Sequence, residues 1–262
     1  MGILNVTPDS FADRRPLGDP AAAIDAALRM EDEGADVIDV GAESTRPGAE
    51  PVAAEVELSR LMPVLEGVVA RVRVPISVDT YKARTASAAL DAGAAIINDV
   101  SGLAYDPPLA AIVAAHDAAL VLMHTRGRPK TMYAEAEYED VLRDVSRELG
   151  ASIKCAVDGG VARDRIIVDP GIGFAKRPVH SYGVLARLPE LASALDRPIL
   201  VGVSRKSFLR EAAWGREAAD RDWATAAAVT AAVLGGAHIV RVHAVAEMAQ
   251  VVRAAEQIRL GT

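Results

Sequence analysis

Eight short apolar runs of this sequence each end in a polar residue that a strand by itself does not need. The ends are Asn5, Thr45, Asp79, Asn98, His124, Asp169, Lys206 and, in the last run, both Arg241 and His243. Together they carry amide, carboxylate, ammonium, guanidinium and imidazole groups. This mixture is suited to binding a polar heteroaromatic ring together with an anion.

Two of these ends, Asp79 and Asp169, are carboxylates, and Asn98 is an amide between them in the sequence. A buried carboxylate is costly unless a hydrogen-bond donor meets it. A ring with adjacent N–H groups, such as the guanidine-like edge of a pterin or guanine, would meet one carboxylate with two hydrogen bonds. Taken singly, each acid is equally well explained as a core acceptor that holds a loop. Taken together at one rim, they favour a ligand site.

Ser204, Arg205 and Lys206 directly follow the seventh run, at the predicted start of a helix. Backbone N–H groups at a helix start bind anions, and Lys206 can donate to a carbonyl or a ring nitrogen. Because adjacent side chains diverge, we expect one of the two cations to be only solvated.

Arg241 and His243 are two residues apart, so on a strand both face the same side. Closure of a barrel would bring them beside Asn5 on the first strand. Arginine, histidine and an amide together suit a diphosphate with a divalent ion. Mg²⁺ prefers oxygen ligands and keeps several waters, so we expect Asn5 to be its one protein ligand.

Helical patterns separate the apolar runs throughout, and this alternation favours a parallel sheet. Eight units predict an α/β fold, a (β/α)₈ TIM barrel with residues 1–262 as one domain, whose strand ends open onto one catalytic face. A doubly wound open sheet also alternates. It normally has about six strands and a glycine-rich phosphate loop at its first turn, which this chain lacks.

Local signals give approximate bounds for the elements. Asp19 and Pro20 are predicted to begin a helix that Gly34 ends, and one helix is predicted to run up to Leu195. Strands are expected over 199–203 and 239–243. The segments 7–19 and 44–48, rich in proline and glycine, are expected to be either surface connections or lids over a second substrate.

Composition excludes several classes of protein. The net charge of −7 argues against a nucleic-acid binder, which is usually basic. No apolar run reaches the roughly 18 residues of a membrane span. The single cysteine, Cys155, fits a reducing cytosol, so a cytoplasmic location is expected; its thiol is predicted to be packed in a helix.

The same polar ends lie within eight segments through which the chain resembles dihydropteroate synthases over nearly its full length. The segments, in the family's order, are GILNVTPDSF (2–11), ADVIDVGAESTRPGA (35–49), ISVDTYKA (76–83), IINDVSG (96–102), VLMH (121–124), IVDPGIGF (167–174), VGVSRKSFL (201–209) and RVH (241–243).

The resemblance implies a transferase of folate biosynthesis. It would condense 6-hydroxymethyl-7,8-dihydropterin diphosphate with p-aminobenzoate and release 7,8-dihydropteroate and diphosphate. It also implies Mg²⁺, a homodimer and competition by sulfonamides. The implied pterin residues are Asp79, Asn98, Met123, Asp169, Phe174 and Lys206. The implied diphosphate and Mg²⁺ residues are Asn5, Arg241 and His243, and those near p-aminobenzoate are Thr45, Arg46, Pro47 and Ser204. Asp79, Lys206, Arg241 and His243 would act in catalysis.

Two other functions fit a pterin-binding barrel. A methyltetrahydrofolate-dependent corrinoid methyltransferase would have no reason to keep Asn5, Arg241 and His243. A catalytically silent pterin-binding barrel would not need every polar end. The chain departs from the family at residues 12–15, at residues 125–127 and at Ala244, where an aspartate is usual. An interaction that supports the site is expected to be missing at Ala244.

Overall fold

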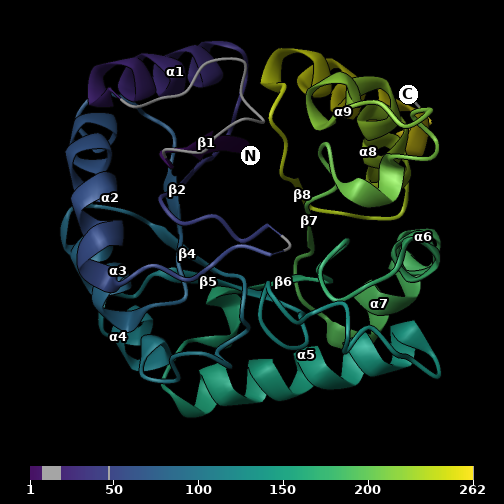
Figure 1. Ribbon diagram of the computed structural model, residues 1–262, viewed down its shortest axis with the longest axis horizontal. Coiled ribbons are helices and arrows are strands. Elements are labelled where there is room, and N and C mark those ends of the chain that lie inside the picture. Colours follow the sequence, from purple (N-terminus) through teal and green to yellow (C-terminus); the bar gives the residue numbers. More distant parts are fainter. Residues whose placement is uncertain (8–18, 47, 262) are drawn as a thin grey trace.

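The computed structural model, which describes residues 1–7, 19–46 and 48–261, is a ring of parallel strands surrounded by helices (Figure 1). Within these residues the strands are β1 (Gly2–Asn5), β2 (Ile38–Gly41), β3 (Ile76–Asp79), β4 (Ile96–Asp99), β5 (Ala119–Met123), β6 (Ile166–Asp169), β7 (Leu200–Val201) and β8 (Ile239–Val240). The first six form one parallel sheet in sequence order, and β7 pairs with β8.

Two backbone bridges join these sheets and close the ring. Val168 of β6 pairs with Ile199, and Gly2 of β1 pairs with Val242. The Ile3 amide donates to the Val242 carbonyl at 3.0 Å, so the first and last strands are hydrogen-bonded to each other. The predicted (β/α)₈ barrel is confirmed, and the open doubly wound sheet is excluded.

Helices cover the outside of the ring (Figure 1). They are α1 (Pro20–Asp32), α2 (Ala54–Val69), α3 (Ala83–Asp91), α4 (Leu109–Ala115), α5 (Val141–Asp158), α6 (Pro178–Ala186), α7 (Leu188–Leu195), α8 (Asp222–Leu234) and α9 (Val245–Leu260). The predicted cap of α1 is confirmed, because the Asp19 carboxylate accepts from the Ala21 amide at 3.0 Å. The single helix expected to reach Leu195 is wrong. The structure has two helices there, and Pro189 in the first turn of α7 cannot continue the hydrogen bonding of α6.

Alternation along each strand separates two apolar layers. Ile38 and Val40 of β2 pack outward with the helices in the main core. Ile96, Val121 and Leu200 form a separate cluster, as expected for the opposite, inward face of their strands. Two residues after Ile96 comes Asn98, and the same step leads from Ile167 to Asp169 and from Ile239 to Arg241. The barrel therefore has an apolar floor and a polar rim.

Two other expectations are wrong. The strands expected over 199–203 and 239–243 are too long: β7 and β8 have only two residues each, and Ile199 and Val242 pair with neighbouring strands only through single bridges. Cys155 is exposed on α5, so its thiol is not packed. No helix of the described residues is long and apolar enough to cross a lipid bilayer.

Candidate active site

The register of the first four strands places one row of residues at the rim. Asn5 is paired with Gly41, Gly41 with Asp79, and Asp79 with Asn98. Because Gly41 has no side chain, the Asn5 and Asp79 oxygens approach this gap. A Cβ atom at Gly41 would lie 3.8 Å from both Asn5 Oδ1 and Asp79 Oδ2. Amide and carboxylate oxygens from different strands thus converge above the barrel floor.

A cavity of about 440 Å³ opens over this row. Its volume suits a small organic ligand. Its walls come from both ends of the sequence and from the loops after β2, β6 and β7. The lining includes Asn5, Thr45, Arg46, Asp79, Phe174, Ser204, Lys206, Arg241 and His243, as well as Thr7, Glu43 and Met132.

Arg241 lies between two buried carboxylates beneath the cavity. Its Nε donates to Asp39 Oδ2 at 2.6 Å, and its Nη2 donates to Asp79 Oδ2 at 3.0 Å. Asn98 Nδ2 donates to the same Asp39 oxygen at 3.2 Å. Burial raises the pKa of Asp79 to about 7, although the Arg241 guanidinium opposes this and the Asp39 carboxylate reinforces it. An additional hydrogen-bond donor or positive charge near Asp79 would therefore be bound favourably.

Lys206, which lines the cavity, meets the buried Asp169 around Gly202. A Cβ atom at Gly202 would lie 3.6 Å from Lys206 Nζ and 3.9 Å from Asp169 Oδ2. Lys206 Nζ donates to the Ile172 carbonyl at 2.6 Å and lies 4.5 Å from the centre of the Phe174 ring. Burial lowers the pKa of Lys206 to about 8, while the Asp169 carboxylate opposes this. The arrangement offers a ring plane, an ammonium donor and a buried acceptor at one place.

The backbone at Arg205 directs Lys206 into the cavity. Arg205 has a φ of 60°, a left-handed conformation that is costly for a residue with a side chain. Its amide donates to Thr225 Oγ1 at 3.0 Å, and its guanidinium binds both Asp222 oxygens at 2.8 and 2.9 Å. The expectation that one of the two cations is only solvated is wrong, because Arg205 is paired with Asp222.

The helix expected to begin directly after Ser204 is also wrong. Only a 3₁₀ turn, η2 (Ser207–Leu209), follows Lys206, and α8 begins at Asp222. The charge of a long helix therefore does not act on the cavity at this point.

His243 and Ser204 form a hydrogen-bonded pair at the cavity wall. Ser204 Oγ accepts from the His243 backbone amide at 3.2 Å and lies 2.9 Å from its Nδ1. Burial lowers the pKa of His243 to about 3, helped by the Arg205 and Arg241 guanidinium groups. A neutral imidazole whose Nδ1 accepts from the Ser204 hydroxyl carries its proton on Nε2. In this tautomer, His243 has an N–H group left to donate to a ligand.

A metal cage made by the protein alone is absent from the part of the chain that the structure describes. No group of three or more His, Cys, Asp or Glu side chains there could hold an ion. Asn5 Oδ1 nevertheless faces the gap above Gly41 beside an Asp79 oxygen. One amide oxygen with ligand oxygens and waters is a donor set that Mg²⁺ accepts. The residues present thus fit an ion that arrives with an anionic ligand.

The sequence matches the family described as pterin binding enzyme over residues 1–243. It is 43% identical over 258 residues to dihydropteroate synthase of Synechocystis, an alignment that spans 98% of this chain and 89% of the relative. The chain belongs to the dihydropteroate synthase family.

Solved structures agree with this assignment. The dihydropteroate synthase of Yersinia pestis in complex with a sulfonamide drug superposes with a TM-score of 0.95 at 39% identity, over 99% of this chain and 94% of that one. The synthase of Xanthomonas albilineans with 4-aminobenzoic acid gives a TM-score of 0.90 at 39% identity, over 99% and 92% of the two chains.

The structure of this family member separates the predicted residues into two groups. Nine line the cavity: Asn5, Thr45, Arg46, Asp79, Phe174, Ser204, Lys206, Arg241 and His243. Asn98, Met123 and Asp169 are buried and do not line the cavity. Asn98 and Arg241 both donate to Asp39 Oδ2. Asp169 accepts from the Gly171 amide at 2.7 Å. Pro47 lies outside the described residues, as does most of the segment 7–19, which was expected to be either a surface connection or a lid.

Asp39 was missed by sequence reasoning, although a signal for it exists. Its side chain is 0% exposed and lies in the middle of a buried strand. A carboxylate there must have a buried cationic partner, and Arg241 is that partner. Lys176 was also missed. It is 1% exposed, and its Nζ lies 2.8 Å from His124 Nδ1 and donates to the Phe174 carbonyl at 3.2 Å.

The departures from the family have local consequences. α9 has no side-chain hydrogen bond at its N-cap, Ala244, and His243 relies on Ser204 instead. Arg126 forms ion pairs with Glu148 and Asp144 of α5. Residues 12–15 lie outside the described residues.

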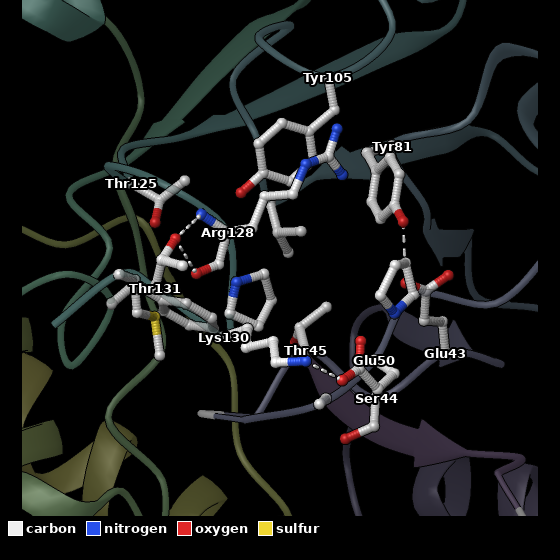
Figure 2. Close-up of a pocket in the computed structure, with 16 residues that line it drawn as sticks. Glu43, Ser44, Thr45, Glu50, Tyr81, Tyr105, Thr125, Arg128, Lys130 and Thr131 are labelled. Atoms are coloured by element: carbon white, nitrogen blue, oxygen red, sulfur yellow. Dashed lines mark hydrogen bonds and ion pairs between the residues drawn. The ribbon is translucent and has the colours of Figure 1, made fainter. Parts of the chain in front are cut away.

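A second cavity of about 280 Å³ is lined in part by the loop that follows β2 (Figure 2). Its lining is largely apolar and includes Tyr81, Tyr105 and Phe174. It shares Glu43, Ser44, Thr45, Met132 and Phe174 with the first cavity. The loop after β2 therefore forms a partition with a cavity on each side.

Proposed function

We propose that this chain is a dihydropteroate synthase. It would join 6-hydroxymethyl-7,8-dihydropterin diphosphate to p-aminobenzoate and release 7,8-dihydropteroate and diphosphate. The observation that carries the proposal is that one cavity brings together Asp79, Lys206, Arg241 and His243, which are groups for a polar ring and for an anion. Membership of the family supplies the identity of the substrates.

The pterin is proposed to bind where Lys206, Asp169 and Phe174 meet. Asp169 would accept from the adjacent N–H groups of the pterin edge, because two parallel hydrogen bonds to a carboxylate fix the orientation of the ring. Lys206 would donate to a ring acceptor and Phe174 would cover one face. Met123 would pack below, and Asn98 would hydrogen-bond the ring. Support comes from the position of Lys206 Nζ and Asp169 Oδ2 around Gly202.

The diphosphate is proposed to bind at Asn5, Arg241 and His243. Arg241 keeps its bond to Asp39 through Nε and can move Nη2 from Asp79 to a phosphate oxygen. The neutral imidazole of His243 would donate from Nε2. We propose Asn5 Oδ1 as the protein ligand of Mg²⁺, which when bound would neutralise charge on the diphosphate oxygens.

The reaction is proposed to be a dissociative displacement at the exocyclic carbon of the pterin. As the carbon–oxygen bond breaks, its electron pair leaves with the diphosphate, and positive charge develops on the pterin methylene. Arg241 and His243 stabilise the first charge and the Asp79 carboxylate the second. The arylamine nitrogen then bonds to the carbon and loses a proton to solvent. A neutral arylamine needs positioning more than deprotonation.

The arylamine is proposed to bind along Thr45 and Arg46, with Pro47 and Ser204 nearby. Arg46 is exposed at the cavity mouth, where a guanidinium can meet a carboxylate. Sulfonamides would compete for this position.

Three further features belong to the proposal. Residues 1–262 would form one pterin-binding domain, and the protein would be cytoplasmic. It would also be a homodimer, for which the 91% exposed Trp223 at the start of α8 is a candidate contact. Sedimentation velocity of the wild type and of Trp223→Glu tests the last point.

The decisive experiment is a coupled assay for diphosphate release with the pterin diphosphate and Mg²⁺, run with and without p-aminobenzoate. We expect release that depends on p-aminobenzoate and matches the dihydropteroate formed. Pterin binding without turnover would instead indicate a silent pterin-binding barrel. Methyl transfer from methyltetrahydrofolate to a corrinoid would indicate the methyltransferase.

A further inference from the structure

A buried ion cluster holds the base of the partition loop, defined here as residues 42–46 and 48–51 between β2 and α2. Lys82 Nζ contacts Glu43 Oε2 and donates to Glu57 Oε2 at 2.8 Å. Thr85 Oγ1 donates to the same Glu57 oxygen at 3.0 Å. The side chains of Lys82, Glu43 and Glu57 are only 13%, 8% and 1% exposed. One ammonium thus joins the loop after β2 to α2.

Both carboxylate oxygens of Glu43 are occupied. Tyr81 donates from its hydroxyl to Glu43 Oε1 at 2.9 Å, as Figure 2 shows, while Lys82 holds Oε2. Burial disfavours the charge on Lys82, yet the two carboxylates more than compensate and raise its pKa. Each oxygen of Glu43 thus has a donor within the cluster, and the two contacts fix the orientation of the carboxylate.

The far end of the partition loop is attached to a different segment. The Gly48 amide donates to the Pro129 carbonyl at 3.0 Å, and Glu50 pairs with Lys130 (Figure 2). The two attachments differ in strength. The Glu50 pair is largely exposed, and exposed pairs contribute little, whereas the Glu43 end is buried. The conformation of Ser44, Thr45 and Arg46 is therefore determined mainly at the Glu43 end.

Tyr81 connects Glu43 to the loop after β5, the segment that also carries Pro129 and Lys130. Its ring packs edge-on against Tyr105, with 5.1 Å between the ring centres. The Tyr105 hydroxyl donates to the Gly127 carbonyl, and the Arg128 guanidinium lies 4.2 Å from the Tyr105 ring centre. The partition loop, the start of α3 and the loop after β5 are thus joined around the second cavity.

We propose that Lys82 and Glu57, acting through Glu43, are positioning residues for the arylamine: they hold the partition loop so that Thr45 and Arg46 form the wall against which p-aminobenzoate binds. This inference rests on the proposed function, because it assumes that the arylamine binds along this loop. Within the described residues, none of the three side chains forms a hydrogen bond or ion pair with Asp169 or Lys206, so the pterin end should not respond to their loss.

The test makes the same change, glutamate to glutamine, in two ion pairs near the start of α3. One is the buried Glu43–Lys82 pair and the other is the exposed Glu55–Arg84 pair. Glu43→Gln weakens the buried cluster and leaves Lys82 paired with Glu57. Glu55→Gln is the matched control, because Glu55 pairs with Arg84 at the exposed surface, with side chains 63% and 65% exposed. We expect Glu43→Gln to raise the KM for p-aminobenzoate by about fivefold or more, since small misplacements of a substrate wall are costly. The control should match the wild type.

A second measurement separates positioning from general stability. The pterin diphosphate is titrated into each variant without p-aminobenzoate, and Glu43→Gln should keep the wild-type Kd within about twofold. If the Kd for the pterin and the KM for p-aminobenzoate worsen together, the cluster is a fold stabiliser and the inference is overturned. Should Glu43→Gln fail to fold, Tyr81→Phe removes one hydrogen bond to Glu43 and should raise the same KM by a smaller factor.

A double variant tests the route of the effect. If Glu43 acts through the loop wall, Glu43→Gln should raise the KM less in an Arg46→Ala background than in the wild type, because coupled residues are not additive. Full additivity contradicts the inference. A wild type that makes no dihydropteroate overturns the proposed function and this inference with it. A working wild type with an unchanged KM in Glu43→Gln overturns the inference alone.

Discussion

Arg241 illustrates how one residue can serve two partners at the rim. Its Nε is bound to Asp39, whose side chain is 0% exposed, and its Nη2 is bound to Asp79, which lies closer to the cavity. The inner bond holds the guanidinium, and the outer one is available for exchange with a ligand. Asp39 also binds Asn98, so one buried carboxylate orients two residues of the proposed site.

The first prediction at the residue scale concerns pterin capture. Lys206→Ala and Asp169→Ala should each weaken binding of the pterin by about 1.5–3 kcal/mol, the usual contribution of a hydrogen bond to a charged group. Calorimetric titration of the pterin into each variant measures this. Arg84→Ala serves as the control, because the Arg84 side chain is 65% exposed and pairs with Glu55 of α2. Unchanged affinity in both variants would refute the assignment of the ring site.

The second prediction concerns pH. Burial lowers the pKa of Lys206 to about 8, so its ammonium is present below that pH and lost above it. Pterin affinity should therefore fall as the pH rises through about 8, and Lys206→Met should lose this alkaline decline. Burial also lowers the pKa of Lys176 and raises the pKa of Asp79, each to about 7, so a decline near 7 that persists in Lys206→Met belongs to one of these two groups. Identical profiles for wild type and Lys206→Met would disprove the role of Lys206.

At the scale of elements, the loops that carry the site are held by ion pairs of very different burial. The Glu43–Lys82–Glu57 cluster is buried between α2 and α3, while Arg84 and Glu55 join the same two helices in solvent. Sequence position does not distinguish them, because Lys82 and Arg84 are two residues apart. Their different surroundings predict different contributions to stability.

Replacement of Lys82 tests this difference. Lys82→Met leaves two buried carboxylates without a cation and should lower the free energy of unfolding by about 3–5 kcal/mol. Arg84→Met should leave the unfolding midpoint nearly unchanged, because its partner is exposed. Urea denaturation of both variants gives the comparison. If Lys82→Met and Arg84→Met lower the free energy of unfolding equally, burial of the cluster does not contribute to stability.

At the scale of the whole molecule, the cavity gathers residues from the loops after most of the strands, so a ligand contacts many elements at once. A ligand that binds only the folded barrel at a concentration of about 100 times its Kd adds roughly 2.7 kcal/mol to stability. For a chain of this size that corresponds to a rise in Tm of roughly 5–10 °C.

We expect this rise with the pterin diphosphate and Mg²⁺, followed by thermal unfolding. Removal of Mg²⁺ with a chelator should reduce the rise, because the diphosphate then lacks its counter-ion. Asn5→Ala with Mg²⁺ present should give the same reduced value. If the chelator has no effect on the wild type, Asn5 is not a metal ligand.

Much of the architecture could be predicted from local patterns. Asp19 before Pro20 predicted the start of α1, and the alternation of apolar runs with helical segments predicted the barrel. The polar residue that ends each apolar run, such as Asn98, indicated the rim. The break between α6 and α7 was missed although Pro189 marks it, because a proline suits the first turn of a new helix and cannot continue the preceding one.

The site was predicted less completely, because it depends on pairs that are distant in the sequence. The sequence alone determined which chemical groups lie at the strand ends, since side-chain direction alternates along a strand and all strands of a parallel barrel run the same way. The tertiary structure alone decided that Arg241 binds Asp39, 202 positions away, that Arg205 turns to Asp222 while Lys206 enters the cavity, and that Lys82 binds Glu43 and Glu57. Such partners are chosen by burial, because a charge removed from water must find its opposite among whichever side chains the closed barrel brings near.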